Sequence, residues 1–163
     1  MFIQYRLMDL TDSPKVAHLL QANAPSNHGD LLGEFPLPKV KGMLMGSSGT
    51  IIAVAAQDVI GVVFSFRSSS TTLPPLASFI IEQFPHLIKN NWLYGPVCIN
   101  KEYRGKDILK TLYDKICALN TGKPVAFINT KNLRSLAAHQ KLGMSIAANF
   151  IFDEIEYYLV IGR

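Results

Sequence analysis

The sequence predicts an α/β (α+β) domain with a mixed, mostly antiparallel central sheet and helices on both faces. Three observations lead to this fold class. Residues 50–66 and 146–161 each have the alternating apolar pattern of a β-hairpin, which is antiparallel. Residues 92–129 read as strand, helix and strand, and such a unit demands a right-handed crossover and a parallel pair. The sheet is therefore expected to contain both kinds of pairing.

The first part of the chain begins with a strand and a helix. Residues 2–8 alternate between apolar and polar side chains, and Ser13–Pro14 supplies an expected N-cap and first-turn proline for the helix that follows. Residues 23–38 are broken by proline and glycine, and a weaker helical pattern from Val40 ends before the glycine and serine residues at 46–49. The region between the two helices is therefore predicted to be a loop.

Two strands and a helical segment occupy the middle of the chain. Residues 50–56 and 59–66 flank the turn Gln57–Asp58 and form the predicted hairpin. A polar loop follows, and apolar residues between Leu76 and Leu87 then fall on one helical stripe, which Pro85 is expected to kink or end.

The stretch from Trp92 to Leu112 joins a strand, a charged turn and a helix without a gap. Gly95–Pro96 lies inside the strand, and because proline cannot donate to a central ladder, a bulge is expected there. The turn at 100–105 leads into a helix with apolar residues at helical spacing from Ile108 onward. Unpaired N–H groups and cations at a helix start favour a phosphate, although the same pattern fits an ordinary solvated turn equally well.

The last part of the chain adds a strand, a helix and a hairpin. Asn120–Thr121–Gly122 gives a helix stop, residues 125–129 form a short apolar strand, and residues 132–142 form a helix closed by Gly143. The final hairpin turns at Asp153–Glu154.

Length and composition indicate one globular domain over residues 1–163. Apolar residues make up 48% of the chain and charged residues 17%, which argues against disorder. The two cysteines, Cys98 and Cys117, have no CxxC spacing and are expected to be reduced core thiols. No metal site is indicated. We expect a cytoplasmic protein, since the N-terminus has no signal-peptide pattern.

The charge pattern argues against nucleic acid and membrane partners. The net charge is +4, but the lysines and arginines are scattered, and no motif interleaves them with exposed aromatic residues. The longest apolar region, 51–66, is interrupted by Gln57–Asp58, which would be costly in lipid. An anionic small ligand needs fewer cations than a nucleic acid does.

Two segments carry a resemblance to a known family. VCINKEYRGKDILKTLY resembles the pyrophosphate motif Q/R-x-x-G-x-G/A of the GNAT superfamily of N-acetyltransferases; Arg104 matches the first position, whereas Asp107 and Leu109 replace small residues. NLRSLAAHQKLGM, residues 132–144, resembles the family pattern N-x-x-(A/S)-x-x-x-(Y/H)-x-K-x-G-(F/M).

The second motif places three polar residues on one helical face. At 100° per residue, Asn132, Ser135 and His139 fall within about 60° of each other, while Leu133 and Leu136 are expected to pack against the sheet. Without the family pattern, the ordinary interpretation is an N-cap, a first-turn serine and a partly exposed histidine.

The resemblance implies an acetyl-CoA-dependent N-acetyltransferase that acts on a primary amine, in a small molecule or a protein, by direct transfer in a ternary complex. It implies that the parallel strands splay apart and that the pantetheine arm pairs with residues 97–99. It also implies His139 as catalytic residue, its imidazolium protonating the departing thiolate. The implied cofactor-binding residues are Val97, Cys98, Ile99, Arg104, Gly105, Lys106, Asp107, Ile108, Leu109, Asn132 and Ser135.

Several alternatives stay open from the sequence. Asp107 either repels the pyrophosphate or points away as a helix N-cap. Residues 68–91 are expected to form a helical insertion between two strands, for which we favour an edge cover over an acceptor lid. His28, Asp30 and Glu34 are candidate acceptor contacts. A homodimer is possible, and the rival to the enzyme is a non-catalytic ligand sensor or interaction module with the same fold.

Overall fold

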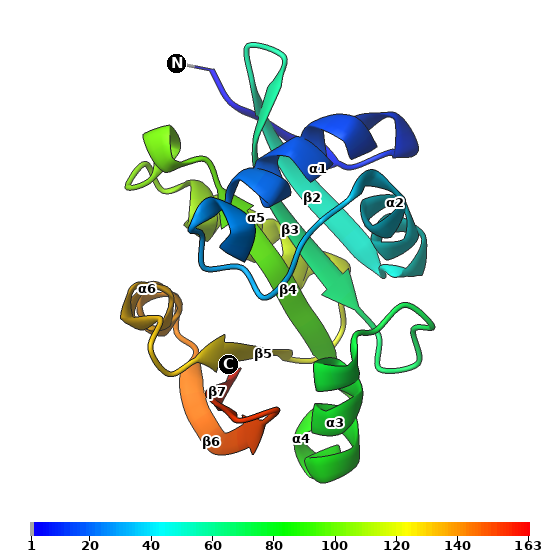
Figure 1. Ribbon diagram of the computed structural model, residues 1–163, viewed down its shortest axis with the longest axis vertical. Coiled ribbons are helices and arrows are strands. Elements are labelled where there is room, and N and C mark those ends of the chain that lie inside the picture. The colour runs from blue at the N-terminus through cyan, green and yellow to red at the C-terminus, as the bar shows by residue number, and fades with distance from the viewer. Residues whose placement is uncertain (1) are drawn as a thin grey trace.

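The computed structural model describes residues 2–163, and its centre is one seven-stranded sheet with the order β1-β2-β3-β4-β5-β7-β6 (Figure 1). The strands are β1 (Gln4–Leu7), β2 (Gly49–Ala55), β3 (Asp58–Phe66), β4 (Trp92–Ile99), β5 (Pro124–Asn129), β6 (Ser145–Phe152) and β7 (Ile155–Ile161). The α-helices are α1 (Ser13–Ala22), α2 (Leu37–Gly46), α3 (Pro75–Gln83), α4 (Pro85–Ile88), α5 (Ile108–Leu119) and α6 (Leu133–Lys141). Short 3-10 helices lie at Leu10–Asp12, Pro25–Asn27 and Lys101–Tyr103.

The pairing of the strands confirms the predicted mixed sheet. Both predicted hairpins, β2–β3 and β6–β7, are antiparallel, and so are β1–β2, β3–β4 and β5–β7. Among the strands of residues 2–163, only β4 and β5 run parallel, because α5 carries the chain across one face of the sheet between them.

The helices divide between the two faces of the sheet and bury a separate apolar cluster on each. On one face, α1, α2 and α3 contribute residues such as Leu20, Val40 and Ile80. On the other, α5 contributes Ile108, Leu112 and Ile116, and α6 packs Leu136 against them. Figure 1 shows α1 in front of β2 and β3, α2 beside β2 at the right, and α5 behind the sheet. Alternation along each strand supplies one set of side chains to each cluster.

The two central strands diverge almost as soon as they meet. The parallel pairing of β4 and β5 comprises Trp92 with Pro124 and Leu93 with Val125, after which the strands run apart. The predicted bulge lies just beyond this point: Val63 pairs with Val97 and Ser65 with Tyr94, so that two residues of β4, Gly95 and Pro96, oppose one residue of β3. The bulge bends β4 away from β5.

The segment between β3 and β4 is helical. In α3 and the residue after it, Phe79 and Phe84 pack against β6, with ring centroids of Phe79 5.8 Å from Phe150 and 5.1 Å from Phe152, and that of Phe84 5.8 Å from Phe150. Pro85 begins the short helix α4 after Phe84 leaves helical geometry. The helices of this segment therefore cover the face of the edge strand β6.

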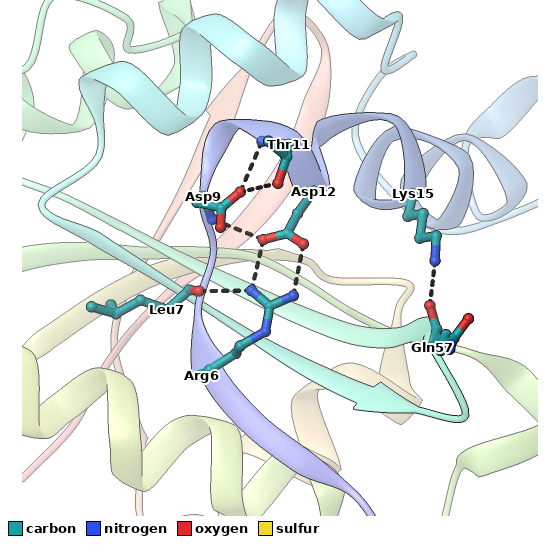
Figure 2. A network of polar contacts seen from close by, with 7 residues as sticks. All are labelled: Arg6, Leu7, Asp9, Thr11, Asp12, Lys15 and Gln57. Carbon is teal, nitrogen blue, oxygen red and sulfur yellow. Dashed lines mark hydrogen bonds and ion pairs between the residues drawn. The ribbon is translucent and has the colours of Figure 1, made fainter.

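The start of α1 differs from the prediction, since Ser13 is not the N-cap. Asp9 and Asp12 form a capping box around the preceding 3-10 helix, and α1 follows it without a break. Figure 2 shows the contacts around this helix start. The Arg6 guanidinium donates to both Asp12 carboxylate oxygens at 2.8 Å and so holds the capping box in place. Lys15 Nζ, in α1, donates to the Gln57 carbonyl. The hydrogen bonds from Arg6 lower the pKa of Asp12. This network ties β1 and the β2–β3 turn to α1.

Candidate functional site

The divergence of β4 and β5 opens a cavity of about 1250 Å³ that is lined by both strands. Leu93 and Phe127, which point to the face of α1–α3, line it together with Tyr94 and Ala126, which point to the face of α5 and α6. The cavity therefore passes between the strands and reaches both faces of the sheet.

The first wall is the outer half of β4. All three predicted residues, Val97, Cys98 and Ile99, line the cavity. One edge of this segment pairs with β3, whereas the pairing with β5 ends at Leu93. Backbone groups on the second edge thus face the cavity, where an extended ligand with amide groups would satisfy them.

Cys98 is a candidate nucleophile by position but not by chemistry. Burial raises the pKa of its thiol to about 12, so that the thiol stays protonated at neutral pH. A covalent acyl-cysteine route through Cys98 is therefore disfavoured.

The turn before α5 forms a second part of the cavity wall. Gly105 and Asp107 both have positive φ, at 77° and 60°, and α5 begins at Ile108. The Asp107 side chain makes no capping hydrogen bond, so the first N–H groups of the helix stay open to a ligand. Asp107 occupies the N-cap position but does not act as a side-chain cap.

The predicted residues of this turn do not all face the cavity. Arg104, Gly105, Asp107, Ile108 and Leu109 line it. Lys106 does not; its Nζ lies 5.3 Å from the centroid of the Tyr103 ring. The turn therefore contributes backbone groups and one arginine rather than two cations.

The Arg104 side chain reaches from the turn toward α1 and α6. Its Nη2 lies 3.5 Å from Asn23 Oδ1, and burial, with a smaller contribution from Arg134, lowers the pKa of Arg104. Arg134 itself pairs with Asp30 at 3.2 Å. Two arginines and one aspartate therefore lie together where the loop before α2 meets α6, and Asp30 offsets the charge of one arginine.

Helix α6 carries the other predicted residues on one face. Asn132 caps the helix by accepting from the Ser135 N–H at 3.2 Å, and both residues line the cavity. Leu136 packs against the sheet as expected, but the expectation for Leu133 is wrong: its side chain is 68% exposed because α6 touches the sheet with only part of its apolar arc.

His139 is buried, with 4% of its surface exposed, rather than partly exposed. Its Nδ1 lies 2.8 Å from the Ser135 carbonyl oxygen, which can only accept, so Nδ1 carries a proton. Its Nε2 lies 3.0 Å from the Tyr94 hydroxyl. Burial lowers the pKa of His139 below its ordinary value of 6.5, so the neutral imidazole is favoured, with Nε2 accepting from Tyr94. This differs from the imidazolium expected from the family pattern.

Tyr94 is the site residue that the sequence did not reveal. It lies 45 positions before His139 and reads as an ordinary strand aromatic. Burial raises its pKa well above the usual value, so it remains a neutral phenol that lines the cavity beside His139. The ring of Tyr113 packs edge-on against it, 5.6 Å between centroids, and fixes its position.

The predicted acceptor contacts separate into one residue at the cavity and two away from it. Asp30 lines the cavity, whereas His28 and Glu34 do not. The Glu34 carboxylate instead accepts from Gln21 Nε2 at 2.8 Å and from the Ser26 hydroxyl, which braces the loop.

Residues 2–163 meet the requirements of neither a metal site nor a membrane-spanning helix. No group of three or more His, Cys, Asp or Glu side chains is placed to hold a metal ion. No helix in this range is long and apolar enough to span a bilayer.

Comparison with known proteins identifies the fold. No family model and no curated protein matches the sequence. Solved structures match it over nearly its whole length: the acetyltransferase of GNAT family from Streptococcus pneumoniae (TM-score 0.68, 15% identity, 98% of each chain covered) and Ard1 from Thermoplasma volcanium (0.73, 13%, 99% of this chain and 97% of that one). A third is yncA from Salmonella typhimurium, solved with its cofactor acetyl-CoA (0.68, 14%, 99% and 93%). The chain has the GNAT acetyltransferase fold.

Proposed function

We propose that this protein is an N-acetyltransferase that moves an acetyl group from acetyl-CoA to a primary amine, with both substrates bound at once. The observation that carries this is the cavity between β4 and β5, which exposes an unpaired strand edge, is lined by the start of α5 and reaches the opposite face of the sheet. One ligand has access along β4 and a second from the face of α1–α3. The similar fold of a protein solved with acetyl-CoA supports the choice of donor.

The residues present fit an elongated donor with an anionic end. Val97, Cys98 and Ile99 offer backbone groups for the amides of pantetheine, and the first N–H groups of α5 offer a place for the pyrophosphate. Asn132 and Ser135 line the opposite wall. The carboxylate of Asp107 stands close to the pyrophosphate position, but it is exposed to solvent, which screens it.

Tyr94 and His139 supply a place to hold a proton. Acetyl-CoA, when bound, would present a thioester, whose exchange for an amide releases one proton from nitrogen and requires one at sulfur. The neutral imidazole is ready to accept at Nε2: Tyr94 passes its hydroxyl proton to Nε2 and takes up another from the amine. The Ser135 carbonyl then stabilises the imidazolium through Nδ1–H. Return of the proton through Tyr94 delivers it to sulfur and restores the pair.

A second candidate function is a non-catalytic sensor of an acyl-CoA or a similar ligand. Asp107 and Leu109 favour it, since both stand at the helix start where a phosphate would approach the backbone most closely. A sensor would bind the ligand in the cavity but would not catalyse acetyl transfer.

Binding and turnover together test the proposal. Acetyl-CoA at 100 times its dissociation constant should stabilise the protein by about 2.7 kcal/mol and raise its melting temperature accordingly. Release of free CoA thiol should then depend on an added primary amine. No shift in melting temperature at millimolar acetyl-CoA would refute binding, and a shift without amine-dependent thiol release across a broad amine panel would favour the sensor.

A further inference from the structure

On the face of α1–α3, the cavity continues as an arm between α2 and the start of α3. We call it the α2 arm and define it by the lining residues Phe35, Lys39, Gly42, Met43, Leu73 and Leu76. Leu73 and Leu76 belong to the segment between β3 and β4, so the start of this segment is a cavity wall while Phe79 and Phe84 cover β6. The walls of the arm are mostly apolar.

Gly42 marks space that the fold does not fill. It lies inside α2, where glycine is the poorest helix former after proline. A Cβ atom placed at Gly42 would meet nothing within 4 Å, so no neighbouring backbone or side chain requires a glycine there. Lys39 and Met43, on the same face of the helix, line the cavity beside it. The glycine keeps the middle of the arm open.

Lys39 is the cation in this apolar wall. Its Nζ donates to the Glu34 carbonyl oxygen at 2.7 Å and lies 4.4 Å from the centroid of the Phe35 ring. Among residues 2–163 no carboxylate forms an ion pair with it, and the nearby Glu34 carboxylate is already bonded to Gln21 and Ser26. An ammonium group has three donors, and only one is used here.

We propose that the α2 arm binds the acceptor and that the acceptor is a small amine with an apolar body and an anionic group, as in an α-amino acid with an apolar side chain. The inference rests on the proposed function. The apolar body would lie against Gly42, Met43 and Leu76, and the anion would pair with Lys39. In the transfer, a bond forms between the amine nitrogen and the acetyl carbon, the carbon–sulfur bond breaks, and one nitrogen proton goes to sulfur.

The anion requirement is tested with matched acceptors. With acetyl-CoA as donor, L-leucine should be used at least tenfold better, in kcat/KM, than L-leucinamide, which lacks the carboxylate, and far better than spermidine. Lys39→Met should lower kcat/KM for L-leucine about tenfold and change that for L-leucinamide less than twofold. Lys41→Met is the control, because Lys41 is exposed on the same helix and does not line the cavity. Equal loss for both acceptors, or no loss for either, would overturn the role of Lys39.

The location is tested by filling the arm. Gly42→Phe should lower kcat/KM for L-leucine at least tenfold while the rise in melting temperature with acetyl-CoA stays unchanged, and Gly42→Ala, which fills less of the arm, should lower it less than Gly42→Phe does. If Gly42→Phe has full activity with the best acceptor, the acceptor lies elsewhere.

Failure of the inference differs from failure of the proposed function. The proposed function fails if acetyl-CoA does not bind, or if it binds and no amine is acetylated. The inference alone fails if spermidine or another cationic amine is the best acceptor. It also fails if L-leucine, L-phenylalanine and L-methionine are neither acetylated nor raise the melting temperature in the presence of CoA.

Discussion

At the scale of single residues, the main result is a buried phenol–imidazole pair beside the cavity. The motif at 132–144 pointed to His139 and implied an imidazolium, but the motif alone does not determine the protonation state of the ring. That depends on burial and on the Ser135 carbonyl and Tyr94 hydroxyl. Tyr94 could not be predicted, because a tyrosine in an apolar strand is ordinarily part of the core, and only the course of β4 brings it to α6.

The pair leads to a prediction about pH. Because the proposed relay needs His139 as the free base and burial lowers its pKa below 6.5, turnover should fall only on the acid side, at a pH below 6.5. Tyr94→Phe keeps the ring and removes the hydroxyl, and like His139→Ala it should lower kcat by about 100-fold. The rise in melting temperature with acetyl-CoA should be the same in both variants.

Measured pH–rate profiles separate the possible roles. A rate that instead falls as pH rises through the histidine pKa would mean that the imidazolium is the acid, as the family pattern implied. Wild-type turnover in His139→Ala would make the ring a bystander.

At the scale of elements, the turn before α5 combines a helix start with an unusual residue. The sequence located this turn and its helix, since strand, turn and helix patterns follow one another from 92 to 119. It left the role of Asp107 open, because a capping aspartate and a strained one look alike in sequence. The structure shows that Asp107 has a left-handed φ of 60° and that its side chain does not cap the helix. Asp107 therefore occupies a backbone position that suits glycine.

Asp107→Gly should therefore tighten the binding of acetyl-CoA. Removing a carboxylate roughly 6 Å from the pyrophosphate should improve the binding free energy by at most about 3 kcal/mol. Solvent screening reduces this gain, so the expected increase in affinity is between about 3-fold and 100-fold. Asp107→Asn separates the causes, since it removes the charge and keeps a side chain that tolerates this backbone. Titration calorimetry should rank Gly tightest, Asn next and Asp weakest. Equal or weaker binding in both variants would mean that Asp107 does not oppose the phosphate.

For the segment between β3 and β4, the sequence pattern predicted the helices but not the surface that they cover. The apolar stripe from Leu76 to Leu87 correctly predicted helices, and Pro85 separates them. An apolar stripe does not reveal which surface it covers. In the structure, Leu73 and Leu76 line the cavity while Phe79 packs on β6, so the segment has the contacts of an edge cover and of a cavity wall.

At the scale of the whole molecule, the mixed sheet could be predicted because each hairpin and the crossover unit have local patterns. The extent of pairing between distant strands has no such pattern. The parallel pair stops at Leu93 and Val125, and this early stop creates the cavity. The wrong predictions for Ser13 and Leu133 have the same origin, since the Arg6–Asp12 pair and the part of α6 that touches the sheet both depend on tertiary contacts.

The most direct test of the account is amide hydrogen exchange with and without acetyl-CoA. If the donor lies along the free edge of β4 and ends at α5, amides in 97–99 and 105–110 should exchange at least tenfold more slowly with the ligand bound. Amides of β2, which pairs with β1 and β3 along its two edges, are the internal control and should change little. Slower exchange in both segments, with β2 unaffected, is the predicted result. Binding of acetyl-CoA without added protection in 97–99 and 105–110 would contradict the account.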